Sequence, residues 1–436
     1  MTFEKAIKER VIFFDGAMGS LLQARGLPAG EPPSSWSIAN PDAVMQVHKE
    51  YIEAGADVIT TNTFSAALRA DGEEMSKAAV ENAKAAIAMA NPGRDVYVAF
   101  DLGPTGRLLQ PMGDLAFDDC LDAYRKIAKA GAQSGADLFI AETMSDLREM
   151  KAAVLAANEA GLPVVATITL EENGRTLTGA SARCAVALLE GLGVDALGMN
   201  CGFGPETALQ FLPEFLENSS TPVIVQPNAG IPVVIEGKTL YKCSPEEFAL
   251  MMRRICESGS LLLGGCCGTT PEFIKALNTA CKDLNPPRPR KKDAVIASSA
   301  TASVLYEHGK TMVGEGVCAK NPQAAKAYRE KDFEALIDEA MDDGSEMLAI
   351  DFSGFDEEEE MLPRIVESIQ EFVKSPLLIR TENPKAADAA LRLANGRPVL
   401  DLTGAANCEA EPLLVEIGLK YGALILRGNS FIRRIH

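Results

Sequence analysis

One pattern recurs along the first two-thirds of this sequence: a helical stretch ends at a glycine, and a short apolar run follows at once. It occurs in YIEAGADVITTNTF (51–64), GAQSGADLFIAET (131–143), GLGVDALGMNCG (191–202) and ESGSLLLGGCCG (257–268). Glycine readily adopts the left-handed conformation that ends a helix. A continuous apolar run suits a parallel strand that is buried on both faces. The pattern therefore predicts helices that alternate with parallel strands.

The first two-thirds of the sequence contain eight apolar runs, which is the number of strands in a (β/α)8 TIM barrel. The eight runs are VIFFDGAMG (11–19), DVITTNTF (57–64), VYVAFDLGP (96–104), DLFIAET (137–143), VVATITL (164–170), ALGMNCG (196–202), PVIVQPNAG (222–230) and LLLGGCCG (261–268). The stretch of chain that contains these runs, residues 11–268, suits a TIM barrel, which typically has about 250 residues. A doubly wound open sheet is the alternative, but it more often carries a GxGxxG turn after its first strand, and DGAMGS (15–20) lacks that spacing. We therefore predict an α/β protein with a barrel over residues 1–283.

Several of these runs end in polar side chains. They are Asp15, Asn62, Asp101, Glu142, Asn200 with Cys201, Asn228, and Cys266 with Cys267. The carboxyl ends of all the strands in a TIM barrel lie on one face, where the active site is built. We therefore expect these side chains to converge on one pocket.

A second domain is expected after residue 301. Residues 284–301 combine three prolines with a basic run, which is typical of an exposed linker. Beyond it, strand-like runs resume at MVGEG (312–316), MLAIDFSG (347–354), PLLIRTEN (376–383), PVLDLTG (398–404) and ALILRGN (423–429). Five strands are too few for a closed barrel. Residues 302–436 are therefore predicted to form a smaller, incomplete-looking α/β domain.

Charge and composition limit the partners. The 436 residues include 42 Lys and Arg against 61 Asp and Glu, a net charge of −19. Nucleic acids and anionic membranes are polyanions, so neither is expected as the main partner. The start MTFEKAIKERVIFF does not resemble a secretory signal, and no apolar stretch reaches the roughly 20 residues of a membrane span. We therefore expect a cytoplasmic protein whose ten cysteines are reduced.

Three cysteines suggest metal chemistry. Cys201 ends the sixth predicted strand, and Cys266 and Cys267 end the eighth. Three thiolates around Zn²⁺ leave one tetrahedral position open, as in catalytic zinc sites. The adjacent pair is alternatively a packing pair or a vicinal disulfide. Because free cysteine is usually buried, we interpret five of the other seven as packing residues: Cys120, Cys184, Cys256, Cys281 and Cys408.

Further motifs accompany these cysteines in a fixed order. They are DGAMGS (15–20), TNTF (61–64), ETMSDL (142–147), GRTLTG (174–179), MNCG (199–202), QPNAG (226–230) and GGCCGTTPEFI (264–274). Together they resemble the homocysteine S-methyltransferase family, and most of all the N-terminal homocysteine-binding barrel of cobalamin-dependent methionine synthases. MNCG together with GGCCGTTP is the most specific part of this resemblance.

The resemblance implies a site and a reaction. Zinc would be bound by the cysteines at 201, 266 and 267, and the thiol of homocysteine would take the fourth position and be methylated to methionine. Asp15 and Glu142 would hold the amino-acid end of homocysteine, the backbone of the turn that starts at Gly16 would face its carboxylate, and Asn200 would shape the floor. Alternatively, Asp15 is a helix N-cap, and Glu142 is a cap or part of an internal ion pair.

The methyl donor is less evident. Residues 302–436 weakly resemble a methyltetrahydrofolate-binding (pterin-binding) domain, but GEGVCAKNP (314–322), DFSG (351–354), RT (380–381) and LDLTGAAN (400–407) replace its characteristic residues. No cobalamin-binding DxHxxG loop is visible. We therefore predict that methylcobalamin is supplied by a separate corrinoid protein. Alternatives are a betaine, sulfonium or folate-derived donor, or a non-catalytic zinc or thiol sensor.

Overall fold

The computed structural model describes residues 1–235, 238–404 and 409–432. These residues form two compact units. The first combines Met1–Leu177 with Val194–Lys291, and the second combines Thr178–Gly193 with Lys292–His436. The division predicted at residues 284–301 stays a prediction, and residues 296–298 within that stretch form a strand, β11.

The first unit is built on a parallel sheet. Among the described residues it has eight strands: β1 (Ile12–Phe13), β2 (Val58–Thr60), β3 (Tyr97–Leu102), β4 (Leu138–Met144), β5 (Val164–Ile168), β6 (Ala196–Asn200), β7 (Val223–Gln226) and β10 (Leu262–Leu263). Their order is β1-β10-β7-β6-β5-β4-β3-β2. All eight predicted strands are therefore present.

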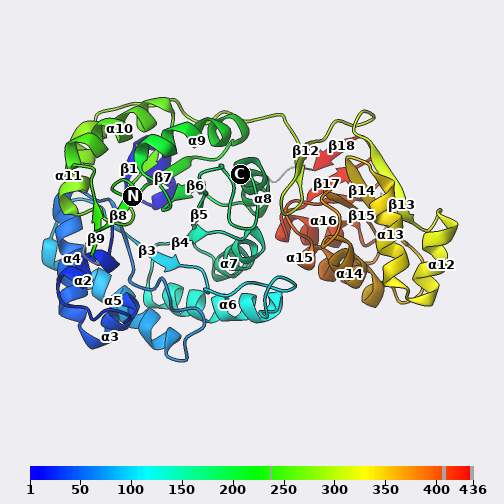
Figure 1. Cartoon of the computed structure of the whole chain (residues 1–436), viewed down its shortest axis with the longest axis horizontal. Coiled ribbons are helices and arrows are strands. Elements are labelled where there is room, and N and C mark those ends of the chain that lie inside the picture. Colours follow the sequence, from blue (N-terminus) through cyan, green and yellow to red (C-terminus); the bar gives the residue numbers. More distant parts are fainter. Residues whose placement is uncertain (236–237, 405–408, 433–436) are drawn as a thin grey trace. The chain divides into compact units, whose positions relative to one another are not determined.

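Hydrogen bonds between the first and last strands of this order close the sheet into a barrel. Phe14 and Val58 form a parallel bridge, and the Asp15 N–H donates to the Val58 carbonyl at 3.1 Å. Figure 1 looks along the resulting ring and shows the helices outside it. The prediction of a (β/α)8 barrel is confirmed.

The helices of the first unit mostly connect successive strands. They are α1 (Phe3–Glu9), α2 (Gly19–Ala24), the 3-10 helix η1 (Pro33–Ser35), α3 (Trp36–Ala39), α4 (Pro41–Ala54), α5 (Gly72–Ala90), α6 (Phe117–Ser134), α7 (Leu147–Ala160), α9 (Pro205–Asn218), α10 (Pro245–Ser258) and α11 (Pro271–Cys281). Local sequence defines their ends. For example, Ser244 and Glu247 form a capping box at the start of α10.

The recurring glycine–aspartate pattern has a structural basis. The glycines stop helices in the left-handed conformation, with φ of 105° at Gly55 and 89° at Gly135. The aspartate two residues later accepts a hydrogen bond from the start of the neighbouring strand. The bonds run from Phe13 N to Asp57, from Val98 N to Asp137 and from Val164 N to Asp195, at 3.0, 2.8 and 2.8 Å. The aspartates thus join β2 to β1, β4 to β3 and β6 to β5.

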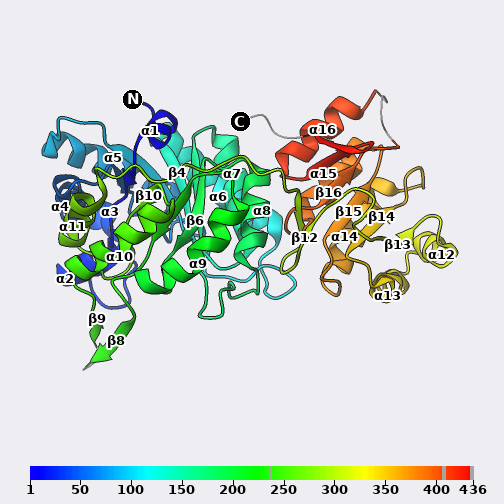
Figure 2. The same ribbon diagram turned by 90° about the horizontal axis from the view of Figure 1, so that it is seen from above.

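One addition to the barrel was not predicted. A two-stranded antiparallel hairpin, β8 (Pro232–Ile235) and β9 (Lys238–Tyr241), follows β7. Figure 2 shows it projecting from the barrel. The last residue of the hairpin, Tyr241, contacts Cys267, as described below.

The second unit contains an open sheet. In its described residues the strands are β13 (Val313–Cys318), β14 (Met347–Asp351), β15 (Leu377–Arg380), β16 (Val399–Asp401), β17 (Leu424–Arg427) and β18 (Ser430–Ile432), in that order. The first five are parallel and match the predicted runs, whereas β18 pairs antiparallel with β17. A smaller α/β domain is therefore confirmed.

Further elements complete this unit. A separate antiparallel hairpin is formed by β11 (Ile296–Ser298) and β12 (Ser303–Leu305). The helices are α8 (Ala182–Leu192), α12 (Pro322–Glu330), α13 (Phe333–Asp343), α14 (Glu358–Ile369), α15 (Pro384–Leu393) and α16 (Glu411–Lys420). Helix α8 belongs to this unit although it lies between β5 and β6 in the chain.

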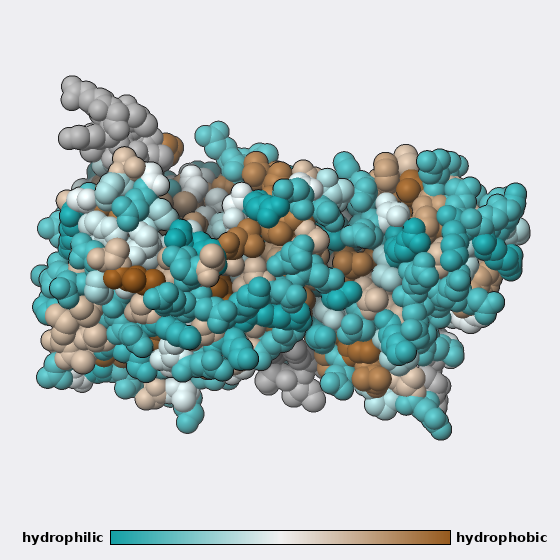
Figure 3. All heavy atoms as spheres, turned by 90° about the horizontal axis from the view of Figure 1, so that it is seen from below, coloured by the Kyte–Doolittle hydropathy of each residue, from teal (hydrophilic) through white to brown (hydrophobic). Residues whose placement is uncertain are grey.

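In the part of the chain that the structure describes, no helix is both long enough and apolar enough to cross a lipid bilayer. On the face of the molecule seen in Figure 3, hydrophilic residues predominate and apolar residues form small separate groups.

Candidate metal centre

Three sulfur atoms meet at the carboxyl end of the barrel. Cys201 follows β6, and Cys266 and Cys267 follow β10. Their sulfur atoms all lie within 4.8 Å of one another, and those of Cys201 and Cys267 are 4.0 Å apart. The expected convergence of these cysteines is therefore present in the fold.

The end of β7 and the loop after it hold the backbone on both sides of this cluster. The Cys201 N–H donates to the Gln226 carbonyl at 3.1 Å, and the Cys266 N–H donates to the Pro227 carbonyl at 2.9 Å. The Cys267 N–H donates to the side-chain oxygen of Asn228 at 3.0 Å. One short segment thus sets the spacing between cysteines that lie 65 residues apart in the sequence.

Unusual backbone geometry aims the sulfur atoms. Cys201 has a φ of 59°, in the left-handed region that residues with a side chain rarely adopt. Gly268, directly after the cysteine pair, has a φ of 80°. A Cβ atom at Gly265 would collide with the Thr269 side chain, so glycine is required before the pair. Strained residues of this kind persist where the surrounding structure holds them, often at functional sites.

The donor set fits a metal ion that prefers sulfur. A tetrahedral zinc ion with bonds of about 2.3 Å to sulfur separates its ligands by about 3.8 Å, close to the Cys201–Cys267 distance. Hydrogen bonds from the Cys266 and Cys267 thiols lower the pKa of Cys201 to about 3. Cys267 is exposed. The cluster can therefore offer three ligands and still admit a fourth from outside.

Asn200 connects this cluster to the carboxyl group of Glu142. It is fully buried, and its oxygen accepts hydrogen bonds from Thr143 N and Thr167 Oγ1, both at 2.9 Å. Its Nδ2 donates to Glu142 Oε2 at 3.0 Å and lies 3.9 Å from the Cys266 sulfur. Asn200 therefore orients Glu142 beside the sulfur cluster.

Glu142 and Asp15 lie close to each other, since the charge of Asp15 acts on Glu142. Asp15 is buried and accepts hydrogen bonds from Thr60 N at 2.7 Å and from Thr60 Oγ1 at 2.9 Å. It forms no helix cap, and Glu142 forms no ion pair, so neither alternative is seen in the described residues. Burial raises the pKa of Asp15 to about 7 and that of Glu142 to about 8, and for Glu142 the nearby charges of Asp15 and Cys201 add to this effect.

The turn after Asp15 presents free backbone donors. Among the described residues, the N–H groups of Gly16 and Met18 donate no hydrogen bond, whereas the Ala17 N–H donates to the Thr269 carbonyl at 3.2 Å. Gly16 packs tightly, because a Cβ atom there would lie 2.5 Å from Thr269 Oγ1. Free N–H groups in such a turn can bind an anionic group.

The sequence did not assign a role to two other residues of the site. Asn228 was recognised only as a polar strand end, and it binds the Cys267 backbone. Tyr241 ends the hairpin, and its hydroxyl hydrogen-bonds the Cys267 sulfur, while burial raises its pKa to about 12. No local signal links Tyr241 to the cysteines, because the contact depends on how the hairpin folds back.

The remaining predicted packing cysteines fall into two groups. Cys120, Cys184, Cys256 and Cys281 are buried, as expected. Cys408 lies outside the described residues.

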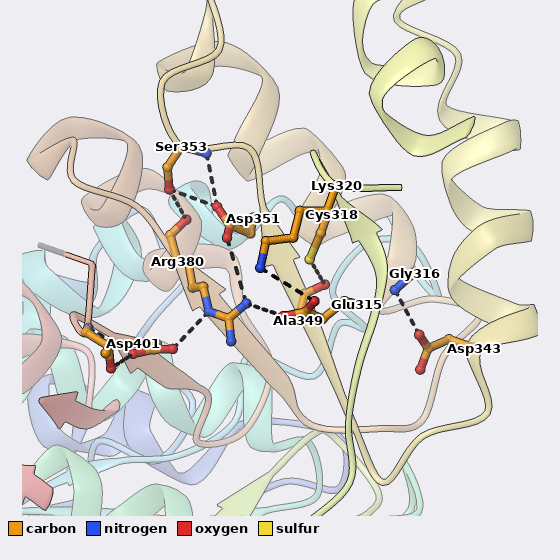
Figure 4. Close-up of polar contacts among 11 residues, drawn as sticks. Glu315, Gly316, Cys318, Lys320, Asp343, Ala349, Asp351, Ser353, Arg380 and Asp401 are labelled. Carbon is orange, nitrogen blue, oxygen red and sulfur yellow. Dashed lines mark hydrogen bonds and ion pairs between the residues drawn. The ribbon is translucent and has the colours of Figure 1, made fainter. Parts of the chain in front are cut away.

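The second unit has its own polar cluster at the carboxyl ends of its strands (Figure 4). The Arg380 guanidinium lies 2.9 Å from Asp401, 3.0 Å from Glu315 and 3.8 Å from Asp351. These residues come from β13, β14, β15 and β16. All four lie in the motifs 314–322, 351–354, 380–381 and 400–407, and Arg380 contacts each of the three carboxylates.

Comparison with known proteins gives a consistent result. A model of the homocysteine S-methyltransferase family matches residues 12–281. The methionine synthase of Mycobacterium tuberculosis is 33% identical over 383 residues, which are 80% of this chain and 32% of that protein. The methionine synthase of Mycobacterium leprae is 33% identical over 373 residues, which are 78% of this chain and 30% of that protein. The chain therefore spans about a third of the length of these curated relatives.

A solved structure is similar to the first part of the chain. The metallated form of the homocysteine methyltransferase MmuM from Escherichia coli superposes with a TM-score of 0.54 and 26% identity. The match covers 64% of this chain and 98% of MmuM.

Proposed function

This chain belongs to the homocysteine S-methyltransferase family, and we propose that it methylates the thiol of homocysteine to give methionine at a zinc ion held by Cys201, Cys266 and Cys267. One observation carries the proposal: the three sulfur atoms lie within 4.8 Å of one another, and the half-buried carboxyl group of Glu142 lies beside them, with the buried Asp15 nearby. A metal with sulfur ligands suits a thiol substrate, and carboxyl groups suit the ammonium group of an amino acid.

The cysteines would provide three zinc ligands and leave one position open. Zinc bound there supplies a positive charge that lowers the pKa of a thiol and favours the nucleophilic thiolate. Asn200 keeps Glu142 at a fixed place beside the sulfur cluster through its 3.0 Å hydrogen bond.

The amino-acid end of homocysteine would lie on the other side of this pocket. Glu142 and Asp15 provide carboxyl groups for the substrate ammonium, and the N–H groups of Gly16 and Met18 are free to meet its carboxylate. Contacts of the protein with the ammonium group and with the carboxylate would hold homocysteine in one orientation beside the cysteine cluster, and such orientation can contribute much of an enzyme's rate enhancement.

For the donor we propose methylcobalamin on a separate corrinoid protein that docks at the mouth of the barrel. Loops after four different strands expose large apolar side chains on this face, namely Phe64, Met112, Leu177 and Ile231. Large exposed apolar patches mark protein docking surfaces, and these four side chains would contribute to such a patch. They support the approach of a macromolecular donor.

The test of the proposed function is zinc content together with activity. We expect about one zinc per chain, and we expect Cys266→Ala to lose both the zinc and the formation of methionine from homocysteine and methylcobalamin. Cys184→Ala, at a buried cysteine outside the cluster, is the matched control and should retain both. Full zinc occupancy in Cys266→Ala would contradict the assignment. Zinc binding without methyl transfer from any donor would favour the sensor alternative.

A further inference from the structure

Asp101 is a buried carboxylate at the mouth of the barrel with an unused hydrogen-bonding atom. It lies near the end of β3 and is 3% exposed. Its Oδ1 has no hydrogen-bond partner among the described residues. A buried polar atom without a partner is costly, and it calls for an explanation such as a ligand.

The fold directs Asp101 toward the substrate pocket. Asp101 pairs with Ile140 across β3 and β4, and alternate residues of a strand share one face. Ala99 belongs to the buried cluster inside the barrel, so Asp101, two residues further along β3, faces the same interior. Glu142 lies in a bulge of β4, and its charge acts on Asp101, so the two carboxyl groups are close together. The backbone of Asp101 is held by the loop after the neighbouring strand β2, because Asp101 N donates to Thr61 Oγ1 at 3.1 Å.

Asp101, Asp15 and Glu142 form a group of acids without a cation. Burial, followed by the charges of Glu142 and Asp15, raises the pKa of Asp101 well above its ordinary range. None of the three has a lysine, arginine or histidine partner in the described part of the chain. Buried carboxylates are normally paired with a positive charge. A cation from outside would therefore complete this pocket.

We propose that Asp101 is a substrate-binding residue whose free oxygen accepts an N–H bond from the α-ammonium group of homocysteine, beside Asp15 and Glu142. The ammonium group has three N–H donors, as many as the pocket has carboxyl groups. This inference rests on the proposed function. It adds a basis for specificity, because a thiol without an ammonium group leaves the three acids without a cation.

The experiment compares two thiols that differ only in this group. Homocysteine and 4-mercaptobutanoate, which lacks the amino group, are titrated by calorimetry into the zinc-loaded protein. We expect the wild-type protein to prefer homocysteine. Asp101→Asn should weaken homocysteine binding by about 10- to 100-fold and change 4-mercaptobutanoate binding less than about twofold, because the amide oxygen can still accept an N–H bond but no longer carries the negative charge that pairs with the ammonium group.

The matched control is Glu149→Gln. Glu149 is also buried, but its Oε1 accepts hydrogen bonds from Thr105 N and Tyr124 OH, which glutamine can retain. This variant should bind both thiols like the wild-type protein. Binding of 4-mercaptobutanoate by Asp101→Asn also shows that the variant is folded.

Three outcomes overturn the inference. The first is unchanged homocysteine binding by Asp101→Asn, and the second is an equal loss for both thiols, which indicates a structural role. The third is a wild-type protein that binds both thiols equally well, which leaves the proposed function intact. If the zinc-loaded protein binds neither thiol, the proposed function itself fails and the inference fails with it.

Discussion

Asn200 shows how much of this site depends on a single side chain. Its side-chain amide is fully buried, and both its oxygen and its nitrogen have hydrogen-bond partners. The nitrogen donates to Glu142 and also to Thr143 Oγ1, the latter at 2.8 Å. Its Nδ2 faces Glu142 on one side and the Cys266 sulfur on the other. Buried networks that are fully satisfied rigidify their surroundings. We infer that Asn200 keeps the sulfur cluster and the carboxyl pocket at a constant separation.

Asp15 gives a prediction about pH. Its pKa is about 7 in the folded protein because of burial, against an ordinary value of 3.8. The folded state therefore binds this proton more tightly than the unfolded chain. The resulting stability is present below about pH 4 and is lost as the pH rises through about 7. The loss from this group should amount to a few kcal/mol, at most about 4.

Asp15→Asn tests this prediction. Asparagine can accept from Thr60 N and donate to Thr60 Oγ1, so the local contacts can be retained without the charge. The free energy of unfolding, measured in a chelating buffer from pH 4 to pH 8, should fall less steeply in this variant than in the wild-type protein. Parallel curves would show that Asp15 does not titrate in this range. Asp137→Asn, at an exposed carboxyl group, serves as the control.

At the scale of the elements, the repeated aspartates tie the barrel strands together in pairs. Asp57 is the most deeply placed of them, since its side chain is 6% exposed and lies 2.6 Å from Arg10 and 3.3 Å from Arg94. Asp137 is exposed to solvent, and Asp195 is half-buried. The same sequence pattern therefore occurs in three different environments.

We expect the cost of removing these aspartates to follow their burial. Asp57→Ala leaves the Phe13 N–H and two arginines without their partner and should destabilise the protein by about 2–4 kcal/mol. Asp137→Ala should cost about 0.5–1 kcal/mol, because water can replace the lost acceptor. Urea unfolding at neutral pH measures both. Equal costs would show that the shared strand contact, and not the environment, determines the effect.

At the scale of the whole molecule, the second unit bears on the methyl donor. Its strand-end cluster is satisfied internally, because Arg380 lies between Glu315, Asp351 and Asp401. Because the positive charge of Arg380 is already paired with these carboxylates, the guanidinium group is not available to bind a ligand. This supports our proposal that a folate bound to the second unit is not the donor.

We therefore predict that the zinc-loaded chain methylates homocysteine with methylcobalamin, free or protein-bound, and not with methyltetrahydrofolate alone. Betaine, S-methylmethionine and S-adenosylmethionine should be tested in the same assay, which measures methionine. Tight and saturable binding of methyltetrahydrofolate to the full chain would contradict the assignment of the second unit. Activity with a sulfonium donor would replace the corrinoid protein by a small molecule.

The sequence determined the barrel, the five parallel strands of the second unit and the identity of the three cysteines. Strand and helix patterns depend on neighbours a few residues apart, so they can be read directly along the chain. The motifs MNCG and GGCCG indicated the three cysteines of the candidate metal site in the same way, because each motif lies at the end of a predicted strand.

Only the tertiary structure decided how these side chains meet. The end of β7 and the loop after it set the sulfur spacing, the hairpin brings Tyr241 to Cys267, and Arg380 joins four strands of the second unit. Asp101 was visible in the sequence only as a polar strand end, and its unpartnered oxygen appeared once the barrel was closed. The physical reason is that these contacts join residues far apart in the sequence, so they depend on strand register and loop packing and not on local pattern.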